Sequence, residues 1–306
     1  MKKLSVLLAA VATVATALAG CSNPDEAKSG SNKATESKGA DISKIEKVDA
    51  IAAKVPKAIK DRGILRNGSS TDYPPAEFRD KDGKTPIGYD IDLTRALAKV
   101  MGLKDGTTEH AEFPTIIPGL GSKFDIGASA FTVSKDRINE TNMITYLKVG
   151  STYAVKKGNP SKFDPKDLCG KAIGVQTGTA QYDSMKAEAE KCKAAGKPEI
   201  KINPHTLHTD AVTKLLGGVY DAVYSDSVVT DYSIKKTDGQ LEQVGDVYES
   251  APIGIAVAKG DTELAKAVEE AMQYLMDKGY LKEILAKYGA EKSALTKAEL
   301  NPADVQ

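Results

Sequence analysis

The feature that most constrains the fold is the alternation of two apolar periods along the chain. Short apolar runs such as AIGVQTG, YDAVYSD and IGIAVAKG are typical of buried strands. Between such runs lie segments with a period of 3.6, and in TELAKAVEEAMQYLMDKG this period places Leu264, Val268 and Leu275 on one side of a predicted helix. Strands that alternate with helices predict an α/β fold with mostly parallel sheets that are covered on both faces.

The segment GYDIDLTRALAKVMG combines both periods. Its first part, GYDIDL, alternates as a strand does, whereas LTRALAKVMG places Leu93, Leu97 and Val100 on one face of a helix that Gly102 ends. We expect two more helices, over TAQYDSMKAEAEKC and over GYLKEILAKYG. The 306 residues are enough for two domain-sized units or one large one.

Residues 1–20 have the composition of an export signal. MKK is a short basic stretch, and LSVLLAAVATVATA is an apolar stretch that is too short for a comfortable membrane span. LAGC follows, and it resembles the lipobox of bacterial lipoproteins, in which Cys21 receives a diacylglyceryl group. We therefore expect an extracytoplasmic protein that is lipid-anchored to the cell membrane through Cys21. An ordinary secretory signal with a chance cysteine is the alternative.

Residues 21–40 follow the expected signal and are rich in Ser, Lys, Glu, Gly and Asn, without a large apolar side chain. Such a segment cannot bury enough apolar surface to fold, so we expect a flexible tether. The folded body would begin near residue 41.

The two remaining cysteines, Cys169 and Cys192, lie in LCGKAIGVQ and AEKCKAAGK. In an exported protein we expect such a pair to form a disulfide. Metal binding by the two cysteines is the alternative, but the nearest histidines, His205 and His208, do not have zinc-finger spacing. The sequence therefore predicts a disulfide and no metal.

The distribution of charge argues against a nucleic-acid partner. The chain has 42 basic and 42 acidic residues, and the two signs are interspersed. A protein that binds phosphates along a nucleic acid needs a concentrated basic stripe. The chain also lacks Trp and has few aromatic residues, which argues against a stacking surface for bases. We expect no nucleic-acid partner.

Polar residues follow several of the predicted strands, where an α/β sheet of this kind holds its ligand. These positions are residues 70–75, 129–137, 176–181 and 226. Among them, Arg137 offers a planar fork of donors that suits a carboxylate, and Ser129 and Thr132 offer hydroxyl groups for the same ligand atoms.

Three further residues complete this chemistry. Thr179 begins a predicted helix after Gly178, so its hydroxyl and the free N–H groups of the helix start suit an anion. Asp226 ends a buried strand and suits an ammonium group, and Tyr73 lies on a stiff loop where its ring would cover an apolar stem. One arginine, several neutral donors and one carboxylate together predict an amino-acid zwitterion as the ligand.

Each of these residues has a simpler explanation when it is taken alone. A single Arg after a strand is usually a surface residue, and Ser or Thr in such a place usually caps a helix. Asp226 would cap the helix that begins at SVVTDY, and YPP is usually a stiff turn. Only the joint placement of these residues after strand ends favours a binding site.

Five motifs together resemble those of a known family. They are GSSTDYPPAEFRDKDGKTPIGYDIDL, KFDIGASAFTVSKDR, GKAIGVQTGTAQ, YDAVYSDS and YLKEILAKYG. Their order and spacing resemble the extracytoplasmic solute-binding proteins of polar amino-acid ABC transporters, bacterial solute-binding protein family 3, in the lipoprotein form of actinobacteria. The resemblance covers nearly the whole expected body, from about residue 64 to residue 289.

The resemblance implies a two-lobed periplasmic-binding-protein-like fold with two hinge crossovers, in GSTYAVKKG and YESAPIGIAVAKG. Lobe 1 would be discontinuous and would comprise residues 41–152 and 248–306. Lobe 2 would comprise residues 153–247, and the ligand would lie in the cleft between the lobes.

The resemblance also implies a role for each residue of the site. Arg137 would bind the α-carboxylate with help from Thr132 and Thr179, Asp226 would bind the α-ammonium, and Tyr73 would cover the side chain. The full set of ligand-binding residues that we expect is Tyr73, Ser129, Phe131, Thr132, Arg137, Thr179, Gln181 and Asp226.

The chain departs from the family pattern at positions that shape the pocket. Ala76 replaces the second aromatic residue of the YPPF loop, and Ala180 replaces a small hydroxyl residue. Phe131 stands where the family has Met, and its ring either restores the lost aromatic contact or packs in lobe 1. Because no acidic residue besides Asp226 is clearly placed for a second cation, the sequence favours Gln, Glu, Asn or a bulkier polar amino acid over Lys or Arg.

We expect a monomer that captures a polar amino acid and delivers it to an ABC permease, without enzyme activity, catalytic residues or a cofactor. One alternative is an enzyme on the same scaffold, such as a dehydratase acting on a cyclic carboxylate. Its general acid or base would have to come from His110, His205 or His208, none of which lies in a ligand segment. The other alternative is a sensory lipoprotein that signals through a partner.

Overall fold

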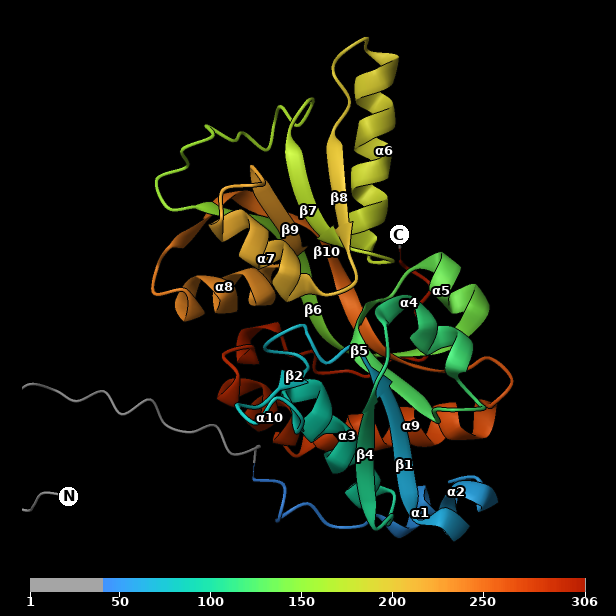
Figure 1. The fold of residues 1–306 in the computed structure, drawn as a ribbon. Helices are drawn as coiled ribbons and strands as arrows, with labels where there is room; N and C mark the ends of the chain where they lie inside the picture. The colour runs from blue at the N-terminus through green and yellow to red at the C-terminus, as the bar shows by residue number, and fades with distance from the viewer. Residues whose placement is uncertain (1–40, 306) are drawn as a thin grey trace, which may run out of the picture. The chain divides into compact units, whose positions relative to one another are not determined.

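An eight-stranded sheet is the centre of residues 41–305, which are the residues described by the computed structural model (Figure 1). The strands of this sheet are β1 (Ile64–Ser69), β4 (Asp105–His110), β5 (Ile126–Thr132), β6 (Thr141–Lys156), β7 (Ala172–Gln176), β8 (Lys201–His205), β9 (Ala222–Asp226) and β10 (Leu241–Ala258). Their order across the sheet is β4, β1, β5, β10, β6, β9, β7 and β8. A separate small sheet pairs β2 (Phe78–Arg79) with β3 (Pro86–Ile87).

Helices cover this sheet along its length (Figure 1). They are α1 (Asp49–Ala52), α2 (Lys57–Arg62), α3 (Tyr89–Val100), α4 (Phe113–Ile116), α5 (Lys135–Glu140), α6 (Ala180–Ala194), α7 (His208–Leu216), α8 (Ser227–Lys236), α9 (Thr262–Asp277) and α10 (Tyr280–Lys287). Short 3-10 turns, η1 (Ile117–Gly119) and η2 (Glu291–Ser293), complete the described part. The expected helices over α6, α9 and α10 and the expected strands at β7 and β9 are confirmed.

The strand directions confirm an α/β fold and make the sheet mixed. β1 runs parallel to β4 and β5, and β7 runs parallel to β8 and β9. The two long strands, β6 and β10, run antiparallel to each other, and they also run antiparallel to β9 and β5 respectively. Mostly parallel pairing therefore holds toward the two edges of the sheet and not at its centre.

Buried apolar side chains form separate clusters. The largest contains Leu65, Leu97 and Met272 and joins the N-terminal part of the described chain to α9 and α10. Another contains Val175 and Tyr224 and is formed mainly by side chains of β6, β7, β9 and α6. We call the parts that surround these two clusters lobe 1 and lobe 2. The discontinuity of lobe 1 and the boundaries at residues 152/153 and 247/248 stay a prediction.

The strands β6 and β10 run from one cluster to the other. The register of their pairing shifts between Tyr248 and Ala251, opposite Gly150. A Cβ atom at Gly150 would lie 2.6 Å from the carbonyl oxygen of Tyr248, which is closer than any side chain allows. Glycine is therefore required where the two crossing strands approach each other.

The strand expected over GYDIDL is wrong, because this segment forms the first turns of α3. Asp90 lies in the first turn, where a carboxylate interacts favourably with the helix N-terminus. Its two oxygens accept hydrogen bonds from the Ala130 N–H at 2.8 Å and the Tyr146 hydroxyl at 2.6 Å. Because this turn is buried on all sides, the polar residues in the pattern are paired interior groups and do not mark an exposed face.

Three expectations fall on residues that the structure does not describe. The signal at residues 1–20, the lipid anchor at Cys21 and the tether at residues 21–40 all lie outside the described residues. Among residues 41–305, no helix has both the length and the apolar character needed to cross a membrane.

Candidate ligand-binding site

The expected site residues converge on one cavity between the lobes. The cavity is lined by Tyr73, Glu77, Phe113, Ser129, Ala130, Thr132, Arg137, Gln176, Thr179, Ala180, Gln181 and Asp226. Most of these residues end or follow β1, β5, β7 and β9, as expected for a ligand beyond the carboxyl ends of strands. Every residue of the expected set lines this cavity except Phe131.

Arg137 is the cationic group of the cavity. One terminal nitrogen of its guanidinium donates to the Thr132 carbonyl oxygen at 2.8 Å, and the other donates to the Gly178 carbonyl oxygen at 3.1 Å. Burial lowers the pKa of Arg137 to about 10, so the side chain stays charged at neutral pH. A guanidinium that is fixed in this way is ready to bind a carboxylate through its other N–H groups.

Asp226 supplies a buried carboxyl group at the end of β9. Its Oδ1 accepts a hydrogen bond of 2.7 Å from the Gln181 amide, which also donates to the Ser151 hydroxyl at 2.8 Å. Burial raises the pKa of Asp226 to about 7. Asp226 occupies the N-cap position of α8, but its side chain makes no capping hydrogen bond, so the simple role of a helix cap does not explain it.

Glu77 supplies a second buried carboxyl group, which the sequence analysis missed. Its Oε1 accepts a hydrogen bond of 2.7 Å from the Ser129 hydroxyl, whereas its Oε2 is buried without a hydrogen-bond partner among residues 41–305. Burial and the nearby Asp90 raise the pKa of Glu77 well above its ordinary value. The expectation that Asp226 is the only carboxyl group placed for a cation is therefore wrong.

Glu77 escaped notice because it does not follow a strand of the main sheet. It lies in a turn that is closed by a backbone hydrogen bond, in which the Tyr73 N–H donates to the Glu77 carbonyl oxygen at 2.8 Å. The available signal was its place in the YPPAEF motif, four residues after the expected ligand residue Tyr73.

Several hydroxyl groups near Arg137 already have partners inside the protein, and their expected role toward a ligand stays a prediction. The Ser129 hydroxyl donates to Glu77, as described above. The Thr179 hydroxyl accepts from the Tyr182 N–H at 3.1 Å and donates to the Gln176 carbonyl oxygen at 2.8 Å, so it caps α6. Ser134 caps α5 in the same manner. The simpler explanation of helix capping therefore accounts for two of these side chains.

Phe131 packs in lobe 1, which is one of the two roles that the sequence left open. Its ring is 1% exposed and stacks on Phe113, with 4.6 Å between the ring centroids. The guanidinium carbon of Arg137 lies 5.3 Å from the Phe131 centroid and 5.5 Å from the Phe113 centroid, within the range of cation–π interactions. Phe113 lines the cavity together with Tyr73, and its four-residue helix α4 is too short for periodicity to reveal.

The lobes touch each other across the cavity. The Asp226 N–H donates to the Tyr73 hydroxyl at 3.0 Å, and the Gln176 amide donates to the Ser70 hydroxyl at 3.2 Å. The hydrogen bond from Arg137 to Gly178 also joins the two lobes. Residues of both lobes are therefore close enough to contact one small ligand at the same time.

Comparison with known proteins agrees with this arrangement. The family model of bacterial extracellular solute-binding proteins, family 3, matches residues 65–291. The chain belongs to this family. The arginine-binding protein ArgT of Corynebacterium glutamicum is similar, with 36% identity over 256 residues, which is 83% of this chain and 83% of that protein.

Solved structures resemble this solute-binding protein at the level of the fold as well. An ancestral arginine-binding protein bound to arginine has a TM-score of 0.66 and 31% identity, and the match covers 74% of this chain and 99% of that one. An ancestral amino-acid-binding protein described as a precursor of cyclohexadienyl dehydratase has a TM-score of 0.65 and 31% identity, with 76% and 97% covered. These matches confirm the two-lobed fold.

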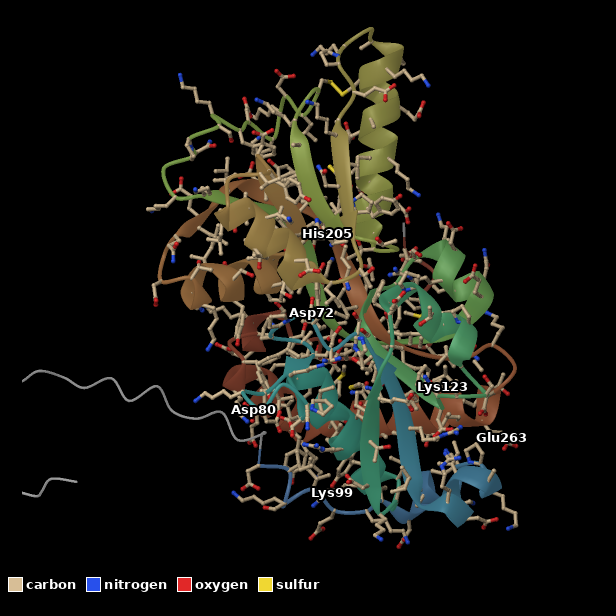
Figure 2. All side chains as sticks on the ribbon, viewed as in Figure 1. Asp72, Asp80, Lys99, Lys123, His205 and Glu263 are labelled. Atoms are coloured by element: carbon tan, nitrogen blue, oxygen red, sulfur yellow. A yellow bond between two sulfur atoms is a disulfide. The ribbon has the colours of Figure 1, made fainter. Side chains whose placement is uncertain are left out.

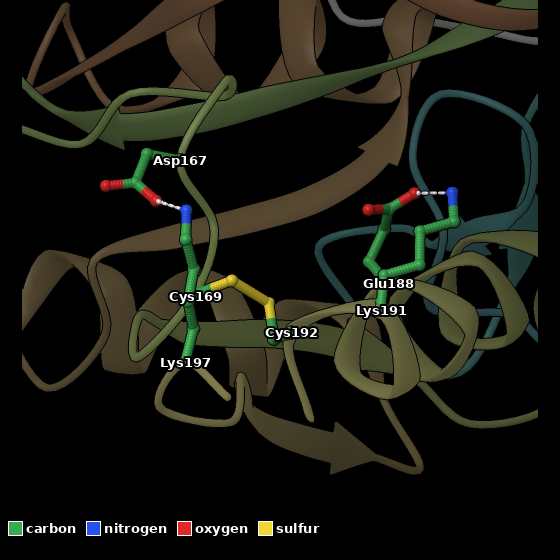
Figure 3. Close-up of a disulfide and its surroundings, with 6 residues drawn as sticks. All are labelled: Asp167, Cys169, Glu188, Lys191, Cys192 and Lys197. Carbon is green, nitrogen blue, oxygen red and sulfur yellow. Dashed lines mark hydrogen bonds and ion pairs between the residues drawn. A yellow bond between two sulfur atoms is a disulfide. The ribbon is translucent and has the colours of Figure 1, made fainter. Parts of the chain in front are cut away.

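This solute-binding protein carries the expected disulfide in lobe 2. Cys169, before β7, is bonded to Cys192 of α6, and both side chains pack beside the lobe 2 cluster (Figure 3). The ion pairs Asp167–Lys197 and Glu188–Lys191 lie on either side of it, with N–O distances of 3.7 and 2.6 Å (Figure 3). The pairing uses both cysteines of the body, which confirms the disulfide over the metal site.

The three histidines of this solute-binding protein do not line the ligand cavity. His110 contacts the Thr71 hydroxyl at 3.0 Å, and His205 contacts the Tyr220 hydroxyl at 2.8 Å. His208 packs against Tyr73 from outside the cavity. The acid–base groups that line the cavity are instead the two carboxyl groups described above.

Proposed function

We propose that the chain captures an α-amino acid with a cationic side chain, such as arginine, in the cavity between its lobes. One observation carries this proposal: the cavity combines one guanidinium, from Arg137, with two buried carboxyl groups, from Asp226 and Glu77. A ligand with one carboxylate and two cationic groups complements all three. A neutral amino acid complements only two of them.

Each end of such a ligand has a partner of the right chemistry. The α-carboxylate binds the free N–H groups of Arg137, together with the Thr132 hydroxyl and the N–H groups at the start of α6. The α-ammonium binds Asp226. The side-chain cation reaches Glu77, whose buried carboxyl group lies beside that of Asp90 and becomes a better partner for a cation when it is charged. Tyr73 and Phe113 flank the aliphatic stem.

In this proposal, a cationic ligand changes the protonation of the carboxyl groups. Burial raises the pKa of both Asp226 and Glu77 and so favours their neutral forms, whereas an arriving cation favours the charged forms. The cavity thereby avoids two uncompensated buried charges while it is empty. The arginine bound by ArgT and by the ancestral protein, as their names state, is consistent with this choice.

Glutamine is the second candidate, because a protonated Glu77 can donate a hydrogen bond to a side-chain amide oxygen. The raised pKa of Glu77 favours this alternative near neutral pH. The two candidates differ in one observable property, which is the release of a proton on binding.

The cellular role that we propose is delivery of the captured amino acid to an ABC permease by a monomer that is held at the membrane through lipid on Cys21. The extracellular family and the export signal support this location. We also propose that capture leaves the ligand chemically unchanged, since the similar proteins named above are binding proteins. Recovery of unaltered ligand by mass spectrometry after incubation tests this point against the dehydratase alternative.

Isothermal titration calorimetry of the purified chain tests the proposed ligand. The panel is L-arginine, L-lysine, L-glutamine, L-glutamate and L-asparagine. We expect the cationic members to bind with a Kd on the order of 1 μM, which corresponds to about 8 kcal/mol. Binding of glutamine or glutamate without binding of arginine or lysine would refute the cationic assignment. A flat titration with every member would refute the capture of amino acids.

A further inference from the structure

A second contact between the lobes lies outside the ligand cavity. Asp72 belongs to the segment that follows β1 in lobe 1, and it faces lobe 2 (Figure 2). Its Oδ1 accepts from the Thr209 hydroxyl at 2.7 Å, and its Oδ2 accepts from the Thr209 N–H at 3.0 Å. Thr209 lies in the first turn of α7, where a carboxylate also interacts favourably with the helix N-terminus.

His208, which precedes Thr209 in α7, is buried in a contact that leaves its ring nitrogens without hydrogen bonds to the described residues. The ring of His208 is 1% exposed and packs edge-on against Tyr73, with 5.0 Å between the ring centroids. Neither of its ring nitrogens has a hydrogen-bond partner among the described residues. A buried polar group without a partner disfavours the arrangement that buries it. The contact of His208 with Tyr73 therefore opposes the approach of the lobes that the Asp72–Thr209 contact favours.

Both contacts depend on the relative position of the lobes. α7 is attached to lobe 2 through Ala211 and Leu215, which pack in a cluster with Val223 of β9, whereas Tyr73 packs in the lobe 1 cluster. An opening of the lobes about β6 and β10 would separate Asp72 from Thr209 and His208 from Tyr73. Asp72, His208 and Thr209 are not among the residues that line the ligand cavity.

We propose that Asp72 and His208 set the affinity for the ligand from outside the cavity, by shifting the balance between open and closed lobes in opposite directions. Asp72 stabilises the closed form because it accepts two hydrogen bonds from Thr209. His208 destabilises the closed form because closure removes its ring nitrogens from water. The proposal rests on the proposed capture of an amino acid by closure. Because the apparent Kd is the intrinsic Kd divided by the fraction of binding-competent molecules, either residue changes affinity without touching the ligand.

The experiment compares Asp72→Ala and His208→Leu with the unaltered full chain in mild detergent, with L-arginine as the calorimetric probe. We expect Asp72→Ala to raise the Kd about tenfold, since it removes two hydrogen bonds to a carboxylate. We expect His208→Leu to lower the Kd several-fold, since leucine fills the same contact without polar atoms. Asp167→Ala is the matched control, because that carboxylate pairs with Lys197 inside lobe 2, and it leaves the Kd unchanged.

Two further readouts separate a shift of closure from a change in the site. A common shift changes the Kd for every amino acid that binds by the same factor, so the ratio of any two affinities stays constant. The double variant Asp72→Ala, Thr209→Val should match Asp72→Ala alone, because one interaction is lost in both. The proposal is overturned if Asp72→Ala leaves the Kd unchanged, or if either variant alters the ratio of the affinities for two ligands. It is also overturned if His208→Leu binds arginine more weakly while its melting temperature equals that of the unaltered chain.

Small-angle scattering of the ligand-free chain keeps this test independent of the proposed function. We expect a larger radius of gyration for Asp72→Ala and a smaller one for His208→Leu, with or without binding of arginine. If arginine fails to bind while these shifts appear, the proposed ligand is wrong and the opposing contacts stand. If arginine binds the unaltered chain and the radii of both variants equal its radius, the opposing contacts are refuted and the proposed ligand stands.

Discussion

Glu77→Gln separates a cationic ligand from a neutral one. The substitution keeps the size of the side chain and leaves an oxygen that accepts the Ser129 hydroxyl, so it removes chiefly the charge that Glu77 takes on beside a cation. A hydrogen bond to a charged group contributes about 1.5–3 kcal/mol, and the neighbouring carboxyl group of Asp90 cannot replace a cation as the partner of a charged Glu77. The Kd for arginine should therefore rise by a factor of about 10 to 150.

The number of protons released on binding tests the same prediction independently of the Kd. In the empty cavity, burial and Asp90 hold the pKa of Glu77 well above its ordinary value, which favours the protonated carboxyl group. A guanidinium lowers this pKa and expels the proton, whereas a glutamine amide leaves it bound. Calorimetry in buffers of different ionisation enthalpy counts the released protons, and the count for arginine should fall in Glu77→Gln.

Glu109→Gln is the control for this substitution. Glu109 is an exposed carboxylate on β4 that pairs with Lys123 at 2.7 Å, away from the cavity, and its replacement should leave both the Kd and the proton count unchanged. Affinity for arginine that is equal in Glu77→Gln and the unaltered chain would refute the assignment of the side-chain cation to Glu77. Equal proton release in these two proteins would refute the reasoning about its protonation.

Further predictions concern the other groups of the structure. Burial raises the pKa of Asp226 to about 7, and a bound ammonium lowers it. The affinity measured by calorimetry should therefore rise with pH up to about 7 and level off above it. Asp226→Asn should bind weakly, and its affinity should lack this rise with pH. Arg137→Ala should abolish measurable binding of every α-amino acid while circular dichroism stays unchanged, and retained affinity would mean that another group holds the carboxylate. Cys192→Ser should lower the free energy of unfolding by about 3 kcal/mol in the chain-entropy model, and a denaturation midpoint equal to that of the oxidised chain would contradict this. Phe131→Ala should lower the free energy of unfolding by about 3–5 kcal/mol, as the truncation of a core residue does, and a loss of affinity alone would contradict its assignment to the buried cluster that contains Phe113.

Local patterns in the sequence were sufficient for most of the architecture. The strands β7 and β9 and the helices α6 and α9 follow from apolar periods, because each period reports the face that one element turns to the core. The exception was α3, whose first turns are buried on every side and carry paired aspartates. A period cannot identify an element that has no exposed face.

The site could be predicted where chemistry and chain position coincide. Arg137 and Asp226 line the cavity beside strand ends, as the rule for parallel strands predicts. Their roles toward the ligand stay predictions. The hydroxyl groups were harder to assign, because Ser129 and Thr179 have partners that only the folded chain identifies. A hydroxyl beside a strand end has the same sequence signature whether it binds a ligand or caps a helix.

The sequence by itself determined the family, the alternation of strands and helices, and the cysteines that pair, because these depend on local order and composition. Only the tertiary structure decided that Glu77 enters the cavity, that Phe113 lines it in place of Phe131, and that the buried His208 has no hydrogen-bond partner among residues 41–305. The physical reason is that burial and pairing are made between distant segments: Glu77 meets Ser129 across 52 positions, and Asp72 meets Thr209 across 137. No local pattern records which of two polar groups finds a partner when the lobes come together.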